Sequence, residues 1–472
     1  MRGGDRELKS RRKTPYLDLT TCPIVPGLLR FALPMIAGDL LQQLYNLTDT
    51  LIVGQVLGKS ALAAVGSAYA LMTFLTSVFL GLSMGAGVLF SMELGQKNFP
   101  RLKSAIAHAF LLILAITAVI NVLLFPLTQP LLAFLSVPAQ VRDPMALYLR
   151  IIFLGLLASS LYNFFACLLR SLGNAAVPLV FLGLSAVLNI ALDLLFVIAF
   201  RWGIGGAAAA TVIAQYAAGI GILVYFFRTC RRFWPGRADF SFDRGVLTDI
   251  LRLSLLTCLQ QSCMNFGILL VQRLVDSFGA VTMAAFAAGV KIDTFAYLPV
   301  QDFGNAFSIF ISQNSGAGRP DRQKKGFLAA TLLSTGFSAL LSLLVCRFAG
   351  PLMQLFVQQG ETEVLTCGIR YLQTEGAFYV GIGCLFLLYG FYRGIGRPGF
   401  SLLLTVISLG TRVMLAYWLA PGIGEIGIWM AIPIGWALAD LAGYGWYFLR
   451  KQRLLPDAAG MTHSMDKAGI SD

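Results

Sequence analysis

Long apolar runs dominate the chain. Twelve of them are long enough to cross a lipid bilayer as helices, which takes about 20 apolar residues each. The runs lack the alternation of strands, and Leu and Ala outnumber β-branched residues, so we expect helices throughout. The predicted spans are 28–57, 61–93, 103–126, 145–171, 176–200, 204–228, 246–277, 281–313, 325–349, 364–393, 399–420 and 425–449.

The composition is that of a membrane protein. Of the 472 residues, 57% are hydrophobic and 12% are charged, whereas soluble domains carry roughly 25% charged residues. These few charges could not cover the surface of a soluble protein of this size. The composition therefore excludes a cytosolic enzyme, a disordered protein and a nucleic-acid-binding protein.

The distribution of Lys and Arg predicts the orientation. Most of the 36 basic residues fall on one side of the predicted spans, and cytoplasmic segments carry such an excess. We therefore expect a multi-pass protein of the cell membrane with both termini in the cytoplasm. The predicted domains are a basic tail at 1–27, a six-helix lobe at 28–228, a linker at 229–245, a second six-helix lobe at 246–450 and a tail at 451–472.

The two halves of the chain repeat. GKSALAAVG at 58–66 is similar to GAVTMAAFA at 279–287, and RSLGN at 170–174 is similar to RGIGR at 393–397, at a near-constant offset. Each half holds six predicted spans, so the repeats share one orientation. Parallel repeats of this kind are typical of transporters. We expect an all-α polytopic membrane protein with twelve transmembrane helices, in two six-helix bundles related by a pseudo-two-fold axis along the membrane normal.

Polar side chains inside the first span identify a candidate site. A charge at the bilayer centre costs about 2.5–3.5 kcal/mol, so such residues face a cavity, pair with one another or bind a ligand. Gln42, Asn46 and Asp49 follow one another at helical spacing on one face, with Tyr45 beside them. Asp39 lies on the same face, nearer the predicted cytoplasmic end. We expect this stripe to face the interior of the bundle.

Two further pairs lie at the level of Asp49. Asn189 and Asp193 share one face of the fifth span, and Thr211 and Gln215 share one face of the sixth. Counting 1.5 Å per residue places Asp49, Asp193 and Thr211 at one depth in the outer half of the membrane. Their oxygen atoms suit a hard cation such as Na⁺, and two close carboxylates also suit a shared proton. The residues leave Na⁺ and H⁺ both open.

The second half departs from this acidic pattern. Lys291, Asp293 and Asp302 lie on the eighth predicted span, and Arg412 occupies the position that corresponds to Asn189. We expect Lys291 to neutralise a carboxylate. Asp293 is the nearest in sequence, although residues two apart on a helix point to different faces. We interpret these four residues as a structural or gating group, with substrate binding as the alternative.

At these residues the chain resembles the multidrug and toxic compound extrusion (MATE) family. The resemblance rests on YNLTDTLIVGQVLGKSALAAVG, NIALDLLF and GAAAATVIAQ, and KIDTFAYLPVQDFGNAFSIFISQN is similar to the bacterial branch related to the DNA-damage-inducible F protein. It covers about 28–450. It implies two lobes forming a V, alternating access, and cation-driven antiport that exports organic cations.

The resemblance also implies roles for single residues. It implies a first-lobe cation site of Asp49, Asn189, Asp193 and Thr211. Tyr45 and Asn163 match positions that line the same cavity, to which the polar stripes add Gln42, Asn46 and Gln215. Family members with a second-lobe cation site carry acidic residues in spans 7 and 10. Here span 10 offers Glu375 and span 7 offers the neutral side chains of Gln260, Gln261 and Asn265.

The sequence leaves rival functions open. A lipid-linked saccharide flippase of the same superfamily would use a cationic cavity, to which Arg412 and Lys291 could contribute. An intramembrane enzyme would need a nucleophile–base pair or metal ligands at membrane depth, and the sequence shows neither. A channel would need a filter-like loop between spans, and the sequence shows none. We expect no catalytic residues and no cofactor beyond Na⁺ or H⁺ as the coupling ion, and a monomer whose partners are lipophilic organic cations and the lipid bilayer, with no nucleic acid.

Overall fold

The computed structural model describes residues 16–134, 139–357 and 360–455, and within these ranges all regular structure is helical. Among these described residues, eleven helices are long and apolar enough to cross a membrane, and a bent pair of helices supplies a twelfth span. Most of the two predicted tails lies outside the described residues.

The first half of the chain forms one bundle. Its fifth predicted span ends in a turn of π-helix, η1. The elements are α1 (Ile24–Leu57), α2 (Lys59–Gly95), α3 (Phe99–Phe134), α4 (Ala139–Ser171), α5 (Ala176–Asp193), η1 (Leu194–Ala199) and α6 (Gly203–Thr229).

The second half repeats this order after two short 3-10 helices, η2 (Arg231–Phe233) and η3 (Arg237–Phe240). The tenth predicted span, 364–393, is two helices bent by 50° at a short break. The elements are α7 (Arg244–Asp276), α8 (Ala280–Gly316), α9 (Pro320–Gln354), α10 (Thr362–Gly376), α11 (Tyr379–Gly394), α12 (Pro398–Ile423) and α13 (Glu425–Leu454).

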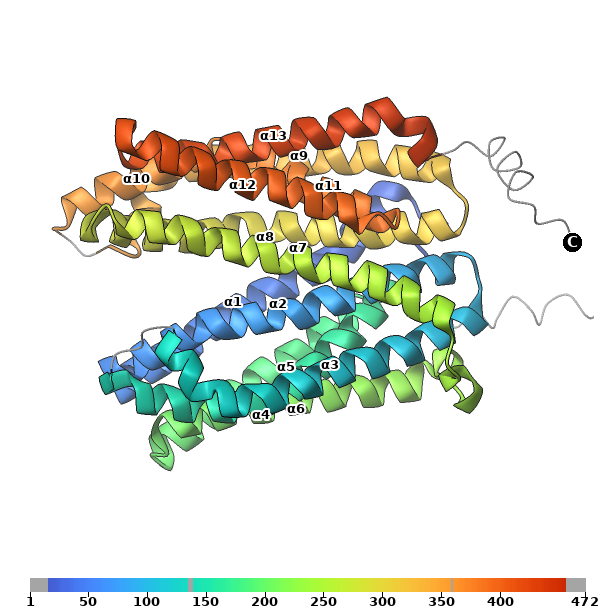
Figure 1. Ribbon diagram of the computed structural model, residues 1–472, viewed down its shortest axis with the longest axis horizontal. Coiled ribbons are helices and arrows are strands. Elements are labelled where there is room, and N and C mark those ends of the chain that lie inside the picture. Colours follow the sequence, from blue (N-terminus) through green and yellow to red (C-terminus); the bar gives the residue numbers. More distant parts are fainter. Residues whose placement is uncertain (1–15, 135–138, 358–359, 456–472) are drawn as a thin grey trace, which may run out of the picture.

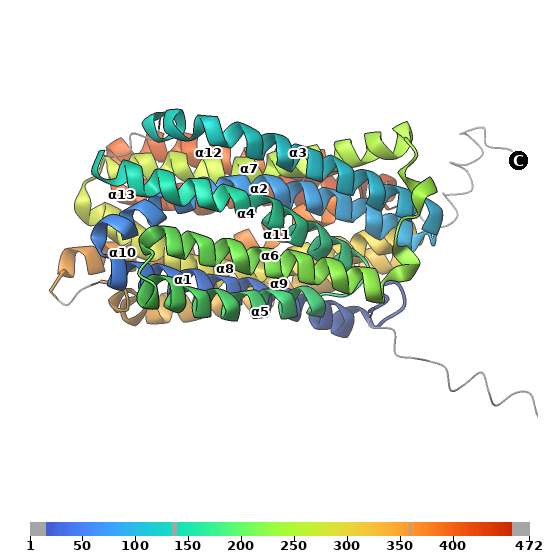
Figure 2. The same ribbon diagram turned by 90° about the horizontal axis from the view of Figure 1, so that it is seen from below.

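The two bundles lie side by side with their helices along the long axis of the molecule (Figure 1). They meet through α1, α2, α7 and α8, because α7 packs on α2 and α8 packs on both α1 and α2. The second view shows α1, α5 and α6 on one side of the molecule and α3 and α12 on the other (Figure 2). We call the end that carries η2, η3 and the start of α7 the linker end, and the other the opposite end.

Close packing joins the lobes over the half of the molecule nearer the linker end. A Cβ atom added to Gly85 of α2 would lie 2.4 Å from the Cα atom of Ser254 on α7, so the two backbones touch there. The hydroxyl of Ser254 also donates to the carbonyl of Leu82, which lies one helical turn before Gly85, at 2.9 Å. Closer to the linker end, Gln313 of α8 donates to the Ser171 carbonyl at 2.8 Å.

The residues just before α1, which belong to the predicted tail at 1–27, pack against both lobes. Leu19 is fully buried, and the backbone around it bonds to both lobes. The Leu17 amide donates to the Gly173 carbonyl of the first lobe at 3.0 Å, and the Leu19 amide donates to Gln313 of the second at 3.3 Å. Arg322 donates to the Leu19 carbonyl at 3.1 Å. Sequence hydropathy misses this segment because it is short and rich in polar residues.

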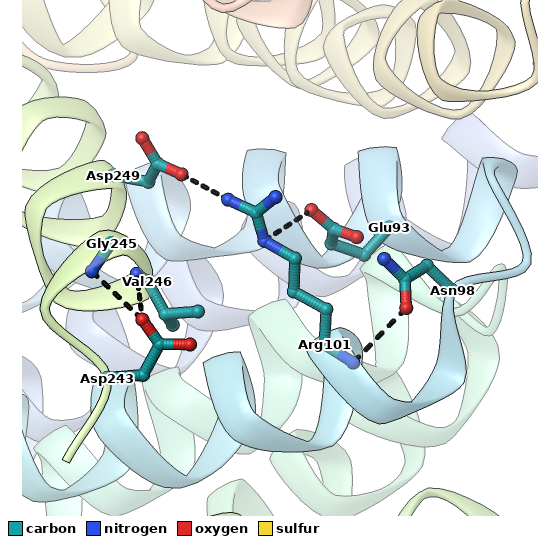
Figure 3. A network of polar contacts seen from close by, with 7 residues as sticks. All are labelled: Glu93, Asn98, Arg101, Asp243, Gly245, Val246 and Asp249. Carbon is teal, nitrogen blue, oxygen red and sulfur yellow. Dashed lines mark hydrogen bonds and ion pairs between the residues drawn. The ribbon is translucent and has the colours of Figure 1, made fainter. Parts of the chain in front are cut away.

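A surface ion network also crosses the interface at the linker end (Figure 3). Arg101 at the start of α3 lies 2.6 Å from the Asp249 carboxylate of α7 and 3.3 Å from that of Glu93 on α2. Asp243 caps α7 by accepting from the amides of Gly245 and Val246. The Arg101–Asp249 pair that crosses the interface is exposed on both sides, and such pairs contribute about 0–1 kcal/mol, so it positions α7 more than it stabilises the fold.

Candidate functional site

Three elements of the first lobe bring the predicted cation-site residues together. Asn189 and Asp193 are fully buried at the end of α5, and Thr211 of α6 is buried beside them. In one orientation the Asn189 amide donates to the Thr211 hydroxyl at 3.3 Å. Turned over, it donates to Asp193 Oδ2 at 2.9 Å and accepts from the Thr211 backbone amide at 3.2 Å. The turned orientation satisfies both amide atoms, so we adopt it.

Asp49 of α1 completes this group from across the bundle. Its carboxyl lies within hydrogen-bonding reach of the Asp193 carboxyl. Asp49 Oδ1 and Asp193 Oδ1 are both buried and have no hydrogen-bond donor among the described residues. An ionised carboxylate only accepts hydrogen bonds, so two that face each other need a cation or a proton between them. The residues therefore fit a bound Na⁺ or a shared H⁺.

Two tyrosines close the site, and the sequence pattern predicts one of them. Tyr45 of α1 faces Asp49 and Asp193, with its hydroxyl in reach of Thr211. Tyr148 of α4 is 8% exposed and faces the same two carboxyls. It lies about 14 Å along α4 from the opposite end, the depth of Asp49. A depth count along the fourth span could have found it.

The other predicted cavity residues differ in exposure and in level. Gln42 is exposed on α1 and Asn46 is half-buried. Gln215 of α6 packs against α4 at Gly155. Asn163 donates to the Ser159 carbonyl of its own helix at 2.9 Å, about 22 Å along α4 from Tyr148. The structure thus does not bring Asn163 to the level of the cation-site residues.

The second lobe holds its own buried group, and it differs from our prediction. Asp293 accepts hydrogen bonds from the hydroxyls of Tyr371 and Tyr379. Glu375 of α10 and Arg412 of α12 face this carboxylate, so the group holds one guanidinium and two carboxyls.

Two expectations about this lobe are wrong. Lys291 is exposed on α8 and forms no ion pair among the described residues, and the basic group that faces the carboxyls is Arg412 of α12. Asp302 is not part of the group around Asp293. It lies further along α8 and faces Asp39 of the first lobe. Both outcomes depend on how each helix is rotated about its own axis, because this rotation sets the direction in which its side chains point.

Comparison with known proteins places the chain in a family. A family model described as MatE matches residues 34–195 and 254–418, more than half of the chain. The chain belongs to the MatE family. Its members are membrane transporters, so this MatE protein is a transporter rather than an enzyme, as its sequence predicted.

Two relatives match this MatE protein over nearly their whole length. It is 28% identical to the probable multidrug resistance protein YpnP of Bacillus subtilis, over 91% of this chain and 96% of the relative. It is 26% identical to an FAD transporter of Shewanella oneidensis, over 90% of this chain and 95% of the relative.

Solved structures show the same fold. One described as the outward-facing conformation of a multidrug resistance MATE family transporter has a TM-score of 0.88 and 24% identity, covering 93% of this chain and 98% of that one. A MOP superfamily transporter from Pyrococcus furiosus has a TM-score of 0.87 at the same identity and coverage. The prediction of an all-helical membrane protein with twelve spans in two bundles is confirmed.

Proposed function

We propose that this MatE protein exports organic cations from the cytoplasm by antiport with Na⁺ or H⁺. The lobes at 28–228 and 246–450 would open alternately to the two sides of the cell membrane, in a monomer whose linker end is cytoplasmic. The single observation that carries the proposal is the pair of facing carboxyls, Asp49 and Asp193, buried beside Asn189 and Thr211.

The acid pair supports exchange of one cation for another. Two carboxylates that face each other without a donor favour whichever positive charge reaches them. Na⁺ would take oxygen atoms from Asp49, Asp193, Asn189 and Thr211, and H⁺ would be shared by the carboxyls alone. Antiport follows if the coupling ion and the organic cation compete or stabilise different states, because a ligand without such a preference shifts no equilibrium.

Pro34 of α1 supports a way to transmit ion binding. Proline removes a helix hydrogen bond and clashes with the preceding turn, so α1 can bend there. An ion held between Asp49 on α1 and Asp193 on α5 draws the two helices together. We propose that this bending narrows the first-lobe cavity and expels the organic cation.

The relatives and the conformation agree with this proposal. The names of similar proteins include multidrug resistance and multidrug export. The lobes pack closely in the half of the molecule nearer the linker end, as expected of a state that opens outward. The flippase alternative gains no support, because Arg412 faces two acids and is not available to a phosphate.

Efflux from proteoliposomes under separate gradients tests the proposal. With tetraphenylphosphonium as the organic cation, we expect uphill export driven by a Na⁺ gradient, a pH gradient or both. Asp49→Asn and Asp193→Asn should each lose at least tenfold of the coupled rate. Thr211→Val should impair only Na⁺ coupling, because the hydroxyl is a Na⁺ ligand but not a proton carrier.

The control is Asp440→Asn, which changes a membrane carboxyl of the second lobe, and it should retain coupling. Wild-type coupling in both first-lobe variants would show that the acid pair does not bind the coupling ion.

A further inference from the structure

A second pair of facing carboxyls lies between the lobes. Asp302 of α8 is 2% exposed, and its carboxyl lies within hydrogen-bonding reach of the Asp39 carboxyl on α1. Asp39 lies about 22 Å along α1 from Ile24, and Asp302 about 21 Å along α8 from Gly316. Both helices therefore present their acid at one depth. Unlike the cation-site acids, this pair crosses the lobe interface.

Basic and polar groups flank the pair from both lobes. Asn305 lies 3.5 Å from Asp302 and accepts from Arg393 of α11 at 2.8 Å, so it connects the carboxyl to that guanidinium. On the first-lobe side, the charge of Arg170 on α4 acts on both acids. The other groups of α4 that face Asp39 are Tyr162 and Cys167.

No donor stands between the two carboxyls in the described residues. Asp302 Oδ2 is buried without a hydrogen-bond partner there. Within the same residues, Arg170 forms no ion pair with either acid, and its Nε atom is also unpartnered. Two ionised carboxylates can only repel each other at this distance, whereas one shared proton makes a hydrogen bond across the interface.

The other side of the interface is built differently. The repeat offset relates Asp302 to Gly81 of α2 and Asp39 to Gln260 of α7. A Cβ atom on Gly81 would lie 2.5 Å from the Cα atom of Cys258, so α2 and α7 touch by backbone packing. The lobes thus meet through close packing on one side and through a carboxyl pair on the other, and the carboxyl pair is the side that can respond to pH.

We propose that Asp39 and Asp302 bind one proton between the lobes, and that this proton stabilises the state in which the lobes are in contact near the linker end. The inference rests on the proposed alternating access. With the proton bound, one carboxyl donates to the other, and Arg170 balances the remaining charge. Without it, two negative charges face each other in a poorly hydrated interface, and separation lets water solvate them. Acid therefore favours contact, and a rise in pH favours separation.

Distances between labels at the linker end test the proposal. Gln96 and Asp321 are exposed there, one on each lobe, and serve as labelling sites in a chain whose eight native cysteines are replaced. In nanodiscs without Na⁺, between pH 5 and 9, we expect the ratio of separated to contacting molecules to rise by up to about tenfold per pH unit. Asp302→Asn and Asp39→Asn should each abolish this response, because a single carboxylate beside a neutral amide has no proton to share.

The control is Asp440→Asn, whose carboxyl lies within the second lobe near Gly381, and it should respond like the wild type. A wild-type response in both interface variants would overturn the proposal. A distance that shifts with tetraphenylphosphonium but not with pH would overturn the shared proton and leave alternating access standing. A distance that shifts with neither would overturn both.

Discussion

The buried acids of the predicted spans form groups that differ in which positive charge faces them. Asp49 faces Asp193 at the candidate cation site, Asp39 faces Asp302 across the interface, and the second-lobe acids face a guanidinium. In the first two arrangements no donor stands between the facing carboxyls among the described residues, although the charge of Arg170 acts on the interface pair, so both invite an ion or a proton. The third already contains its cation, which indicates a structural role.

The second-lobe group yields a stability prediction. Arg412→Met removes the cation that faces Asp293 and Glu375, and leaves two buried acids together. Arg412 forms no direct ion pair with either acid among the described residues, so we expect a loss below the roughly 3–5 kcal/mol of a broken buried ion pair. We expect a clearly lower melting temperature in detergent. Lys291→Met, at an exposed position of α8, is the matched control and should change stability by less than about 0.5 kcal/mol. Equal losses in the two variants would contradict the role given to Arg412.

At the scale of helices, the contact between α2 and α7 depends on a small residue. Gly85→Ala would place its methyl group 2.4 Å from the Ser254 Cα atom, so the helices must move apart. Overpacking of this kind costs about 1–3 kcal/mol. We expect a lower melting temperature, whereas Gly336→Ala on α9, where an added Cβ meets nothing within 4 Å, should not lower it.

The segment before α1 can be followed through Cys22. Burial raises the pKa of the Cys22 thiol, partly offset by the charge of Arg322, and the thiolate is the reactive form. Leu19→Asp would place a charge at a fully buried position and release the segment. In a chain with Cys22 as its single cysteine, we expect maleimide to react several-fold faster. Thr21→Asp, at an exposed neighbour, should leave the rate unchanged, and equal rates in both variants would show that the segment is not held by Leu19.

At the scale of the whole molecule, the proposed orientation is open to direct measurement. Ser241 is exposed in the linker and Arg201 is exposed at the opposite end. In intact cells, an impermeant thiol reagent should label Arg201→Cys and spare Ser241→Cys until the membrane is opened. Labelling of Ser241→Cys from outside would reverse the proposed orientation.

The sequence alone determines the number of spans, the residues that share a helical face and their depth along each helix. The lengths of the apolar runs predict twelve spans. Helical spacing places Asn189 and Asp193 on one face of their helix, and Thr211 and Gln215 on one face of theirs. These properties depend on residues a few positions apart. Depth along a helix is equally local, which is why the sequence alone groups Asp49, Asp193 and Thr211.

Only the tertiary structure decided which helix faces which. The pairing of Asp39 with Asp302, the turn of Arg412 toward Asp293 and the exposure of Lys291 depend on how each helix is rotated against its neighbours. The same holds for Tyr148 and Glu375, and for the burial of Leu19 between the lobes. Rotation and crossing angle are set by side-chain packing between residues far apart in the chain, so a one-dimensional pattern cannot specify them.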